Sequence, residues 1–144
     1  APGLKVQPLI CYESLFPGLA RPDTDVRALV NVSNDAWFGV TSGPLQHLNL
    51  ASYRAIEAGR PMIRATPTGV SAMVDARGRV VGDQRLDLGD RGVIDAPLPA
   101  IGGETPASRL GDWPFLLMLL ASVAICIGIS RIAGHKFAAV KDMG

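Results

Sequence analysis

Short apolar runs separated by turn-forming residues characterise the first part of the chain. The run 28–32 (ALVNV) is apolar at nearly every position, which is typical of a strand buried on both faces and favours parallel pairing. Gly78, at the end of the segment 75–78, indicates the tight turn of a hairpin. We expect strands at residues 4–10, 28–32, 62–65, 70–75, 79–81 and 92–96.

One segment repeats its apolar positions at the spacing of a helix. Pro44 suits a first helical turn, residues 45–58 carry one apolar stripe, and Gly59 is typical of the residue that ends a helix. The stripe comprises Leu48, Ala51, Ala55 and Ala58. Because strands alternate with this helix, residues 1–100 predict an α/β domain.

A second apolar pattern begins at Trp113, where 18 residues without charge follow one another (113–130, WPFLLMLLASVAICIGIS). As a helix this run is about 27 Å long, close to the roughly 30 Å thickness of a bilayer core. Trp113 lies where an interfacial aromatic residue belongs, and basic residues follow the run. These are Arg131, His135, Lys136 and Lys141. We expect one transmembrane helix, with a buried core helix as the alternative.

The charges on the two sides of this run indicate its orientation. Residues 1–112 carry 11 Lys and Arg against 12 Asp and Glu, whereas residues 131–144 carry three against one. Basic residues close to a span favour the cytoplasmic side. We expect residues 131–144 to form a cytoplasmic tail, residues 101–112 a juxtamembrane linker, and residues 1–100 a domain on the outer side.

Composition excludes several classes of protein. The chain has 144 residues, 48% of them hydrophobic, with a net charge of +1 and a mean hydropathy of +0.25, which fits neither a disordered chain nor a nucleic-acid-binding tail. Two cysteines without zinc-ligand spacing predict no disulfide framework and no metal site. We expect no cofactor and no nucleic-acid partner. Because the first residue is Ala, we expect the chain to be part of a longer polypeptide.

Cys11 is the candidate nucleophile. It follows the first expected strand, and α/β folds present ligands and nucleophiles beyond the carboxyl ends of strands. On this ground alone, a buried structural cysteine is the alternative. The second cysteine, Cys126, lies in the expected span and should be an inert apolar side chain.

Ordered motifs around Cys11 carry a resemblance to a known family. The segment 10–13 (ICYE), followed by Phe16 and Pro17, resembles the nucleophile segment of the nitrilase or carbon–nitrogen hydrolase superfamily. Further segments resemble one branch of it, the apolipoprotein N-acyltransferase family. They are 34–39 (NDAWFG), 43–47 (GPLQH), 54–61 (RAIEAGRP), 64–66 (RAT), 69–72 (GVSA) and 111–114 (GDWP).

This resemblance implies a fold and a set of catalytic residues. The fold is the C-terminal part of a nitrilase-like αββα sandwich, followed by one transmembrane helix. The family uses a Glu–Lys–Cys triad, of which Cys11 is present here, while the family's Glu and Lys precede Ala1. Lys5 does not match the family's lysine motif. The resemblance also implies a supporting role for Glu13, and for the backbone N–H of Tyr12 a role in stabilising an oxyanion.

The resemblance further implies the reaction and its partners. The family moves a fatty acyl chain from a phospholipid, through a thioester on the cysteine, to the N-terminal diacylglyceryl-cysteine of bacterial apolipoproteins. The enzyme lies in the bacterial inner membrane with its catalytic domain on the periplasmic side, and its partners are these two lipid substrates and the bilayer. Two alternatives remain open: a membrane-tethered carbon–nitrogen hydrolase such as an amidase, and an inactive fragment.

Several other residues allow two interpretations. Trp37 and Phe38 either line an acyl-chain pocket or fill the base of a loop. His47 is expected to be structural, because thiol activation in this superfamily uses carboxylate and lysine. A basic cluster near the end of the expected helix either pairs with Glu57 or Asp35, or binds a phosphate headgroup. It comprises Arg54, Arg60 and Arg64.

Overall fold

The computed structural model describes residues 3–21 and 23–141, with side chains described up to residue 130. The chain divides into two units, one ending at Arg109 and the other beginning at Leu110. The β-strands are β1 (Val6–Ile10), β2 (Ala28–Val32), β3 (Met62–Ala65), β4 (Ser71–Val74) and β5 (Val80–Leu86). The helices are the 3-10 turns η1 (Cys11–Leu15), η2 (Pro17–Leu19) and η3 (Ala36–Phe38), with α1 (Gly43–Ala58), α2 (Pro106–Leu110) and α3 (Trp113–Lys141).

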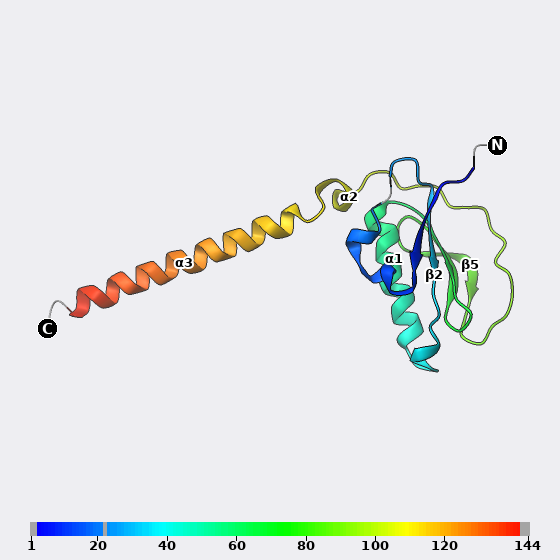
Figure 1. The fold of residues 1–144 in the computed structure, drawn as a ribbon, viewed down its shortest axis with the longest axis horizontal. Helices are drawn as coiled ribbons and strands as arrows, with labels where there is room; N and C mark the ends of the chain where they lie inside the picture. The colour runs from blue at the N-terminus through cyan, green and yellow to red at the C-terminus, as the bar shows by residue number, and fades with distance from the viewer. Residues whose placement is uncertain (1–2, 22, 142–144) are drawn as a thin grey trace. The chain divides into compact units, whose positions relative to one another are not determined.

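The first unit is a mixed α/β domain built on a five-stranded sheet in the order β1-β2-β3-β4-β5 (Figure 1). Strands β1, β2 and β3 are parallel, as predicted for the first pair, and β4 and β5 continue the sheet as an antiparallel hairpin. The carboxyl ends of β1, β2 and β3 therefore meet at one edge of the sheet. The segments that follow these strands carry the candidate site.

One face of the sheet packs against α1. Because side chains alternate between the two faces of a strand, Leu9, Leu29 and Met62 share a face and are almost fully buried. They form one hydrophobic core with the predicted stripe of α1. Buried members of that stripe are Leu48, Ala51, Ala55 and Ala58. Each apolar side chain of Leu or Met size contributes about 1.5–3 kcal/mol when fully buried.

Helix α1 begins and ends where the sequence predicts. Pro44 lies in its first turn, and Gly59 caps its end with a left-handed φ of 60°. A Cβ at Gly59 would overlap the backbone carbonyl of Gly103. The position therefore requires glycine for conformation and for space.

The strand predicted at residues 92–96 is wrong. The segment forms no strand, and β5 is the last strand of the sheet within the described residues. Val93 at its centre is 91% exposed. Apolar composition alone does not make a strand without a neighbouring strand to accept its backbone hydrogen bonds. The hairpin is correct in place, but its second strand extends to Leu86, beyond the predicted 79–81.

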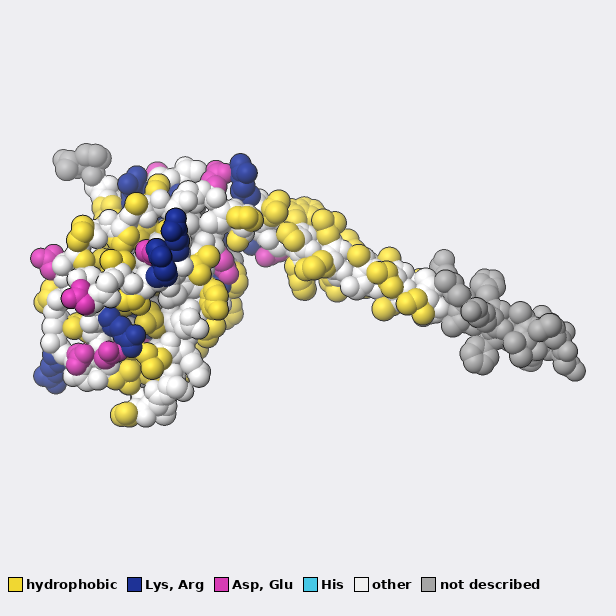
Figure 2. Space-filling view, turned by 180° about the vertical axis from the view of Figure 1, so that it is seen from behind, with side chains coloured by type: hydrophobic (Ala, Val, Ile, Leu, Met, Phe, Trp, Pro, Cys, Tyr) yellow, Lys and Arg dark blue, Asp and Glu magenta, His cyan; other side chains and the backbone are white. Residues whose placement is uncertain are grey.

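The second unit contains α3, which extends through Lys141. Its window Trp113–Ser130 has a mean hydropathy of 2.2, and none of the window is buried in the described structure, unlike the core helix of a soluble domain. Hydrophobic side chains cover the described part of this helix (Figure 2). The helix continues beyond the predicted boundary at Ser130. The last three residues of the predicted tail, 142–144, lie outside the described residues.

Candidate active site

Cys11 lies at the junction of β1 and η1 in a strained backbone conformation. Its φ is 50°, and among the described residues it is the one non-glycine position with a positive φ. A non-glycine residue held in this region costs on the order of 1–3 kcal/mol, and such strain clusters at functional sites. A nucleophile on a sharp strand-to-helix turn is presented clear of the sheet. The thiol itself is free and half-buried.

Two side chains of η1 fix the turn that carries Cys11. The Glu13 carboxylate accepts a hydrogen bond from the Ile10 backbone N–H at 2.7 Å, and Ser14 Oγ donates to the Cys11 carbonyl at 3.0 Å. The Ile10 N–H and the Cys11 carbonyl are thereby satisfied. The ring of Tyr12 stacks on His47 with 5.6 Å between ring centroids. The predicted residues Cys11, Tyr12 and Glu13 thus form one ordered turn.

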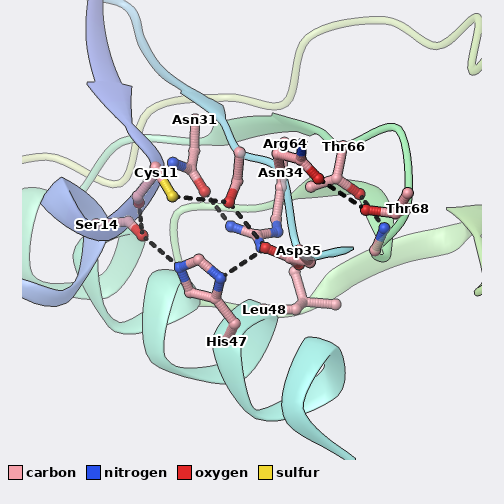
Figure 3. A network of polar contacts seen from close by, with 12 residues as sticks. Cys11, Ser14, Asn31, Asn34, Asp35, His47, Leu48, Arg64, Thr66 and Thr68 are labelled. Atoms are coloured by element: carbon pink, nitrogen blue, oxygen red, sulfur yellow. Dashed lines mark hydrogen bonds and ion pairs between the residues drawn. The ribbon is translucent and has the colours of Figure 1, made fainter. Parts of the chain in front are cut away.

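Ser33 lies beside the Cys11 sulfur. Its Oγ is 3.6 Å from Cys11 Sγ and 2.8 Å from Asp35 Oδ1. Figure 3 shows Cys11, Asp35 and His47 in the same network of polar contacts. Ser33 directly follows β2, and its backbone N–H bonds the Ala65 carbonyl at the end of β3. Parallel pairing of β1 with β2 brings the residues that follow these strands together.

Asp35 is a buried carboxylate that accepts hydrogen bonds from three sides. Besides Ser33, His47 Nδ1 donates to Oδ1 at 2.9 Å and Arg64 Nη2 donates to Oδ2 at 2.8 Å. Burial raises the pKa of Asp35, but the hydrogen bond from Ser33, the charge of Arg64, and the hydrogen bond and charge of His47 outweigh it. The pKa is lowered below its ordinary value. A Cβ at Gly69 would overlap this carboxylate, so the site requires glycine there.

Arg64 links the Asp35 carboxylate to the side chain of Asn31 on β2. It projects from β3 and also bonds the side-chain oxygen of Asn31, whose amide donates to the Leu9 carbonyl at 2.8 Å. Burial lowers the pKa of Arg64 by more than the charge of Asp35, their hydrogen bond and the negative charge of Cys11 raise it, so the pKa of Arg64 lies below its ordinary value. Cys11 and this guanidinium are therefore electrostatically coupled.

The two aromatic residues predicted to bind substrate have different surroundings. Phe38 packs edge-on against the His47 ring, with 5.9 Å between centroids. Trp37 is 80% exposed and anchors its indole N–H on the Asn34 carbonyl at 3.0 Å. Phe38 therefore packs beneath the site against His47, whereas the apolar ring of Trp37 is exposed to solvent.

The basic residues near the end of α1 are committed to internal partners. Arg54 pairs with Glu57, and Arg60 donates to the Val26 carbonyl at 2.7 Å. With Arg64 held by Asp35, the geometry favours the internal pairing that the sequence left open over headgroup binding. Lys5 lies on the exposed surface and pairs with Asp25.

The sequence did not predict the network beneath Cys11 as a unit. Its members, apart from His47, come from the ends of β2 and β3. They are Asn31, Ser33, Asp35 and Arg64. A usable signal was that β2 and β3 are parallel neighbours, since polar residues at the carboxyl ends of such strands meet. Within the described residues, no cluster of three or more His, Cys, Asp or Glu side chains could hold a metal ion.

Comparison with known families decides the assignment of this domain. The sequence model of the carbon–nitrogen hydrolase family matches residues 1–102, which include Cys11 and the whole network beneath it. The chain belongs to the carbon–nitrogen hydrolase family. The resemblance to the carbon–nitrogen hydrolase superfamily inferred from the segment around Cys11 is therefore confirmed.

Two curated relatives of this chain are apolipoprotein N-acyltransferases. The apolipoprotein N-acyltransferase of Caulobacter vibrioides is 68% identical over 135 residues, covering 92% of this chain and 26% of the relative. That of Shewanella oneidensis is 42% identical, covering 90% of this chain and 24% of the relative. The chain thus spans about a quarter of the length of these relatives.

Among solved structures, one that matches this chain is Nit3 of Saccharomyces cerevisiae, a member of branch 10 of the nitrilase superfamily. It is 25% identical, with a TM-score of 0.47, and the match covers 60% of this chain and 34% of Nit3.

Proposed function

We propose that this chain is the cysteine-bearing part of an apolipoprotein N-acyltransferase and that Cys11 is its nucleophile. The observation that carries the proposal is the position of Cys11. It is strained, half-buried and next to a hydroxyl, in a segment that matches the family and its 68% identical relative.

The first half of the proposed reaction loads Cys11. The thiolate attacks an ester carbonyl of a phospholipid, the carbon–oxygen bond breaks, and the lysophospholipid leaves with a proton, so that a thioester remains on Sγ. An unperturbed thiol is only a few per cent ionised at neutral pH and needs a base or a cation to activate it. In this proposal the base is the glutamate and the cation is the lysine that the family resemblance places outside this chain.

The second half transfers the acyl chain. The free α-amine of a diacylglyceryl-cysteine attacks the thioester carbonyl, the carbon–sulfur bond breaks, and an amide forms while the amine proton returns to the activating base. Both tetrahedral intermediates carry an oxyanion. In a 3-10 helix an N–H bonds the carbonyl three residues earlier. Tyr12 is the second residue of η1, so its N–H has no such carbonyl inside η1 and is suited to bind this oxyanion. One such donor contributes about 3 kcal/mol.

Glu13, Trp37 and Phe38 have supporting roles in this proposal. Glu13 keeps the turn at Cys11 in place through its hydrogen bond to the Ile10 N–H. Phe38 supports the site through His47. The exposed indole of Trp37 contacts an acyl chain of one of the substrates.

Membrane attachment through α3 is consistent with substrates that are themselves lipids. We propose that its apolar window spans the bacterial inner membrane, with the C-terminus in the cytoplasm and the catalytic domain at the periplasmic surface. Substrates with acyl chains leave a bilayer slowly, so attachment places the nucleophile where both substrates are concentrated.

The test uses the full-length protein that carries this segment, purified in detergent with a phospholipid and a diacylated lipoprotein. We expect Cys11→Ala to reduce N-acylation at least 1,000-fold, roughly the scale seen when a nucleophile is removed. Cys126→Ala, which removes the other cysteine of the chain, should leave the rate unchanged. Undiminished triacylated product from Cys11→Ala would contradict the proposal. Release of free fatty acid without acylated lipoprotein by the unmodified protein would instead favour the hydrolase alternative.

A further inference from the structure

Ser33 has one hydroxyl proton and two neighbours that can accept it. Its Oγ lies 2.8 Å from Asp35 Oδ1 and 3.6 Å from Cys11 Sγ. While Cys11 is a thiol, the carboxylate is the stronger acceptor, and the S–H can donate to Ser33 Oγ in turn. Once Cys11 is a thiolate, both acceptors are charged, and the Ser33 hydroxyl can donate its hydrogen to only one of them at a time.

Asp35 does not depend on the Ser33 proton. When Ser33 turns away, Oδ1 still accepts from His47 Nδ1 at 2.9 Å and Oδ2 still accepts from Arg64 Nη2 at 2.8 Å. Because Asp35 is a carboxylate, His47 Nδ1 is the donor in this contact. Among the described residues, Ser33 is the donor that contacts the Cys11 sulfur, so its hydroxyl proton gains more by turning to the thiolate than by staying on Asp35.

The charges around Cys11 do not replace this hydroxyl. The charged or titratable groups that face the turn come from four segments: Tyr12 and Glu13 of η1, Asp35 after β2, His47 and Arg54 of α1, and Arg64 of β3. Arg54 donates to the Leu15 carbonyl and is paired with Glu57. The guanidinium of Arg64 is coupled to the Cys11 charge, but it is paired with Asp35, whose opposite charge cancels much of its field at the sulfur. A direct donor is therefore the effective source of stabilisation within this chain.

We propose that Ser33 is a positioning residue whose hydroxyl switches its hydrogen bond from Asp35 to the Cys11 thiolate and so favours the reactive form of the nucleophile. The inference rests on the proposed role of Cys11. Asp35, held by His47 and Arg64, keeps the hydroxyl within reach of sulfur and gives up its bond when the thiolate forms. No proton leaves Ser33 in this step; only the acceptor of its hydrogen bond changes.

The test measures the thiol itself, without substrate. In the full-length protein, the rate of Cys11 alkylation by iodoacetamide is followed against pH by mass spectrometry of the Cys11 peptide. We expect Ser33→Ala to raise the apparent pKa of Cys11 by about one unit, the size expected for loss of a hydrogen bond to a charged group. Ser33→Thr, which keeps the hydroxyl, should restore the original profile.

Ser52→Ala is the matched control. Ser52 is as buried as Ser33, at 7% exposure, but its hydroxyl donates to the Leu48 carbonyl within α1. We expect this variant to leave the alkylation profile unchanged. Ser33→Gly provides a second removal of the hydroxyl if Ser33→Ala folds poorly.

The outcomes separate this inference from the proposed function. An alkylation profile of folded Ser33→Ala or Ser33→Gly that matches the unmodified protein would overturn the role of Ser33, whatever the activity of Cys11→Ala. An equal shift in Ser52→Ala would overturn it as well, because the effect would then be general loosening. Retained acyl transfer by Cys11→Ala would remove the proposed function, while the thiol titration would still report on Ser33.

Discussion

Asp35 is a buried anion whose stability depends on its neighbours. Its side chain and that of Arg64 are both fully inaccessible to solvent, so neither charge is stabilised by water. A buried ion pair gains little over an apolar pair, but removing one partner leaves an uncompensated charge. The network beneath Cys11 is therefore sensitive to single substitutions.

We expect Asp35→Asn to destabilise the domain by about 3–5 kcal/mol, because the buried guanidinium of Arg64 loses its counter-charge. Asp75→Asn is the control, since it breaks a pair in which Arg79 is largely exposed and should cost about 1 kcal/mol or less. Thermal melting of the full-length protein in detergent compares the two variants. Equal melting temperatures would contradict the importance of the network.

The contribution of Asp35 to stability should depend on pH, with a sign that follows from its lowered pKa. The folded-state pKa of Asp35 is lowered, so its ionisation stabilises the fold fully above the unfolded value of about 3.9. This contribution is lost as pH falls from there through the lower folded-state pKa. We expect acid to narrow the difference in melting temperature between the unmodified protein and Asp35→Asn. A difference that widens in acid would contradict the assignment.

Elements with strong local signals could be predicted, and elements that depend on distant partners could not. Proline and glycine punctuation with one apolar stripe sufficed to predict α1, and continuous apolar composition sufficed to predict β2 and the apolar part of helix α3. The segment 92–96 has strand-like composition, but it pairs with none of the strands of the described sheet. The positive φ of Cys11 arises from the turn as a whole and has no marker in the residue type.

We expect a charge in the middle of α3 to prevent it from spanning the membrane. Leu120 lies near the centre of the apolar window and is exposed in the described structure. Leu120→Arg should cost about 3 kcal/mol of insertion free energy. A green fluorescent protein fused to the C-terminus of the full-length protein, which fluoresces in the cytoplasm, should lose its signal in Leu120→Arg and keep it in Leu120→Ile. Bright fusions of both variants would contradict a span ending in the cytoplasm.

The described first unit presents an uncovered sheet face. On the face opposite α1, Ile10 and Val32 are 54% and 42% exposed, although both lie in the sheet beside the site. The four-layer arrangement implied by the family resemblance would cover this face with a second sheet. The motifs in the sequence predict Cys11 as the nucleophile, but the network that Asp35 and Arg64 form beneath it depends on the parallel register of three strands.

The measurement that tests the central claim most directly is the trapping of the acyl intermediate on Cys11. The full-length protein is incubated with phospholipid alone and digested, and the Cys11 peptide is weighed before and after treatment with neutral hydroxylamine, which cleaves thioesters. We expect the mass of one fatty acyl group on this peptide, removed by hydroxylamine and absent in Cys11→Ala. Acyl transfer that proceeds with the acyl group on another residue, or with no covalent intermediate, would contradict it.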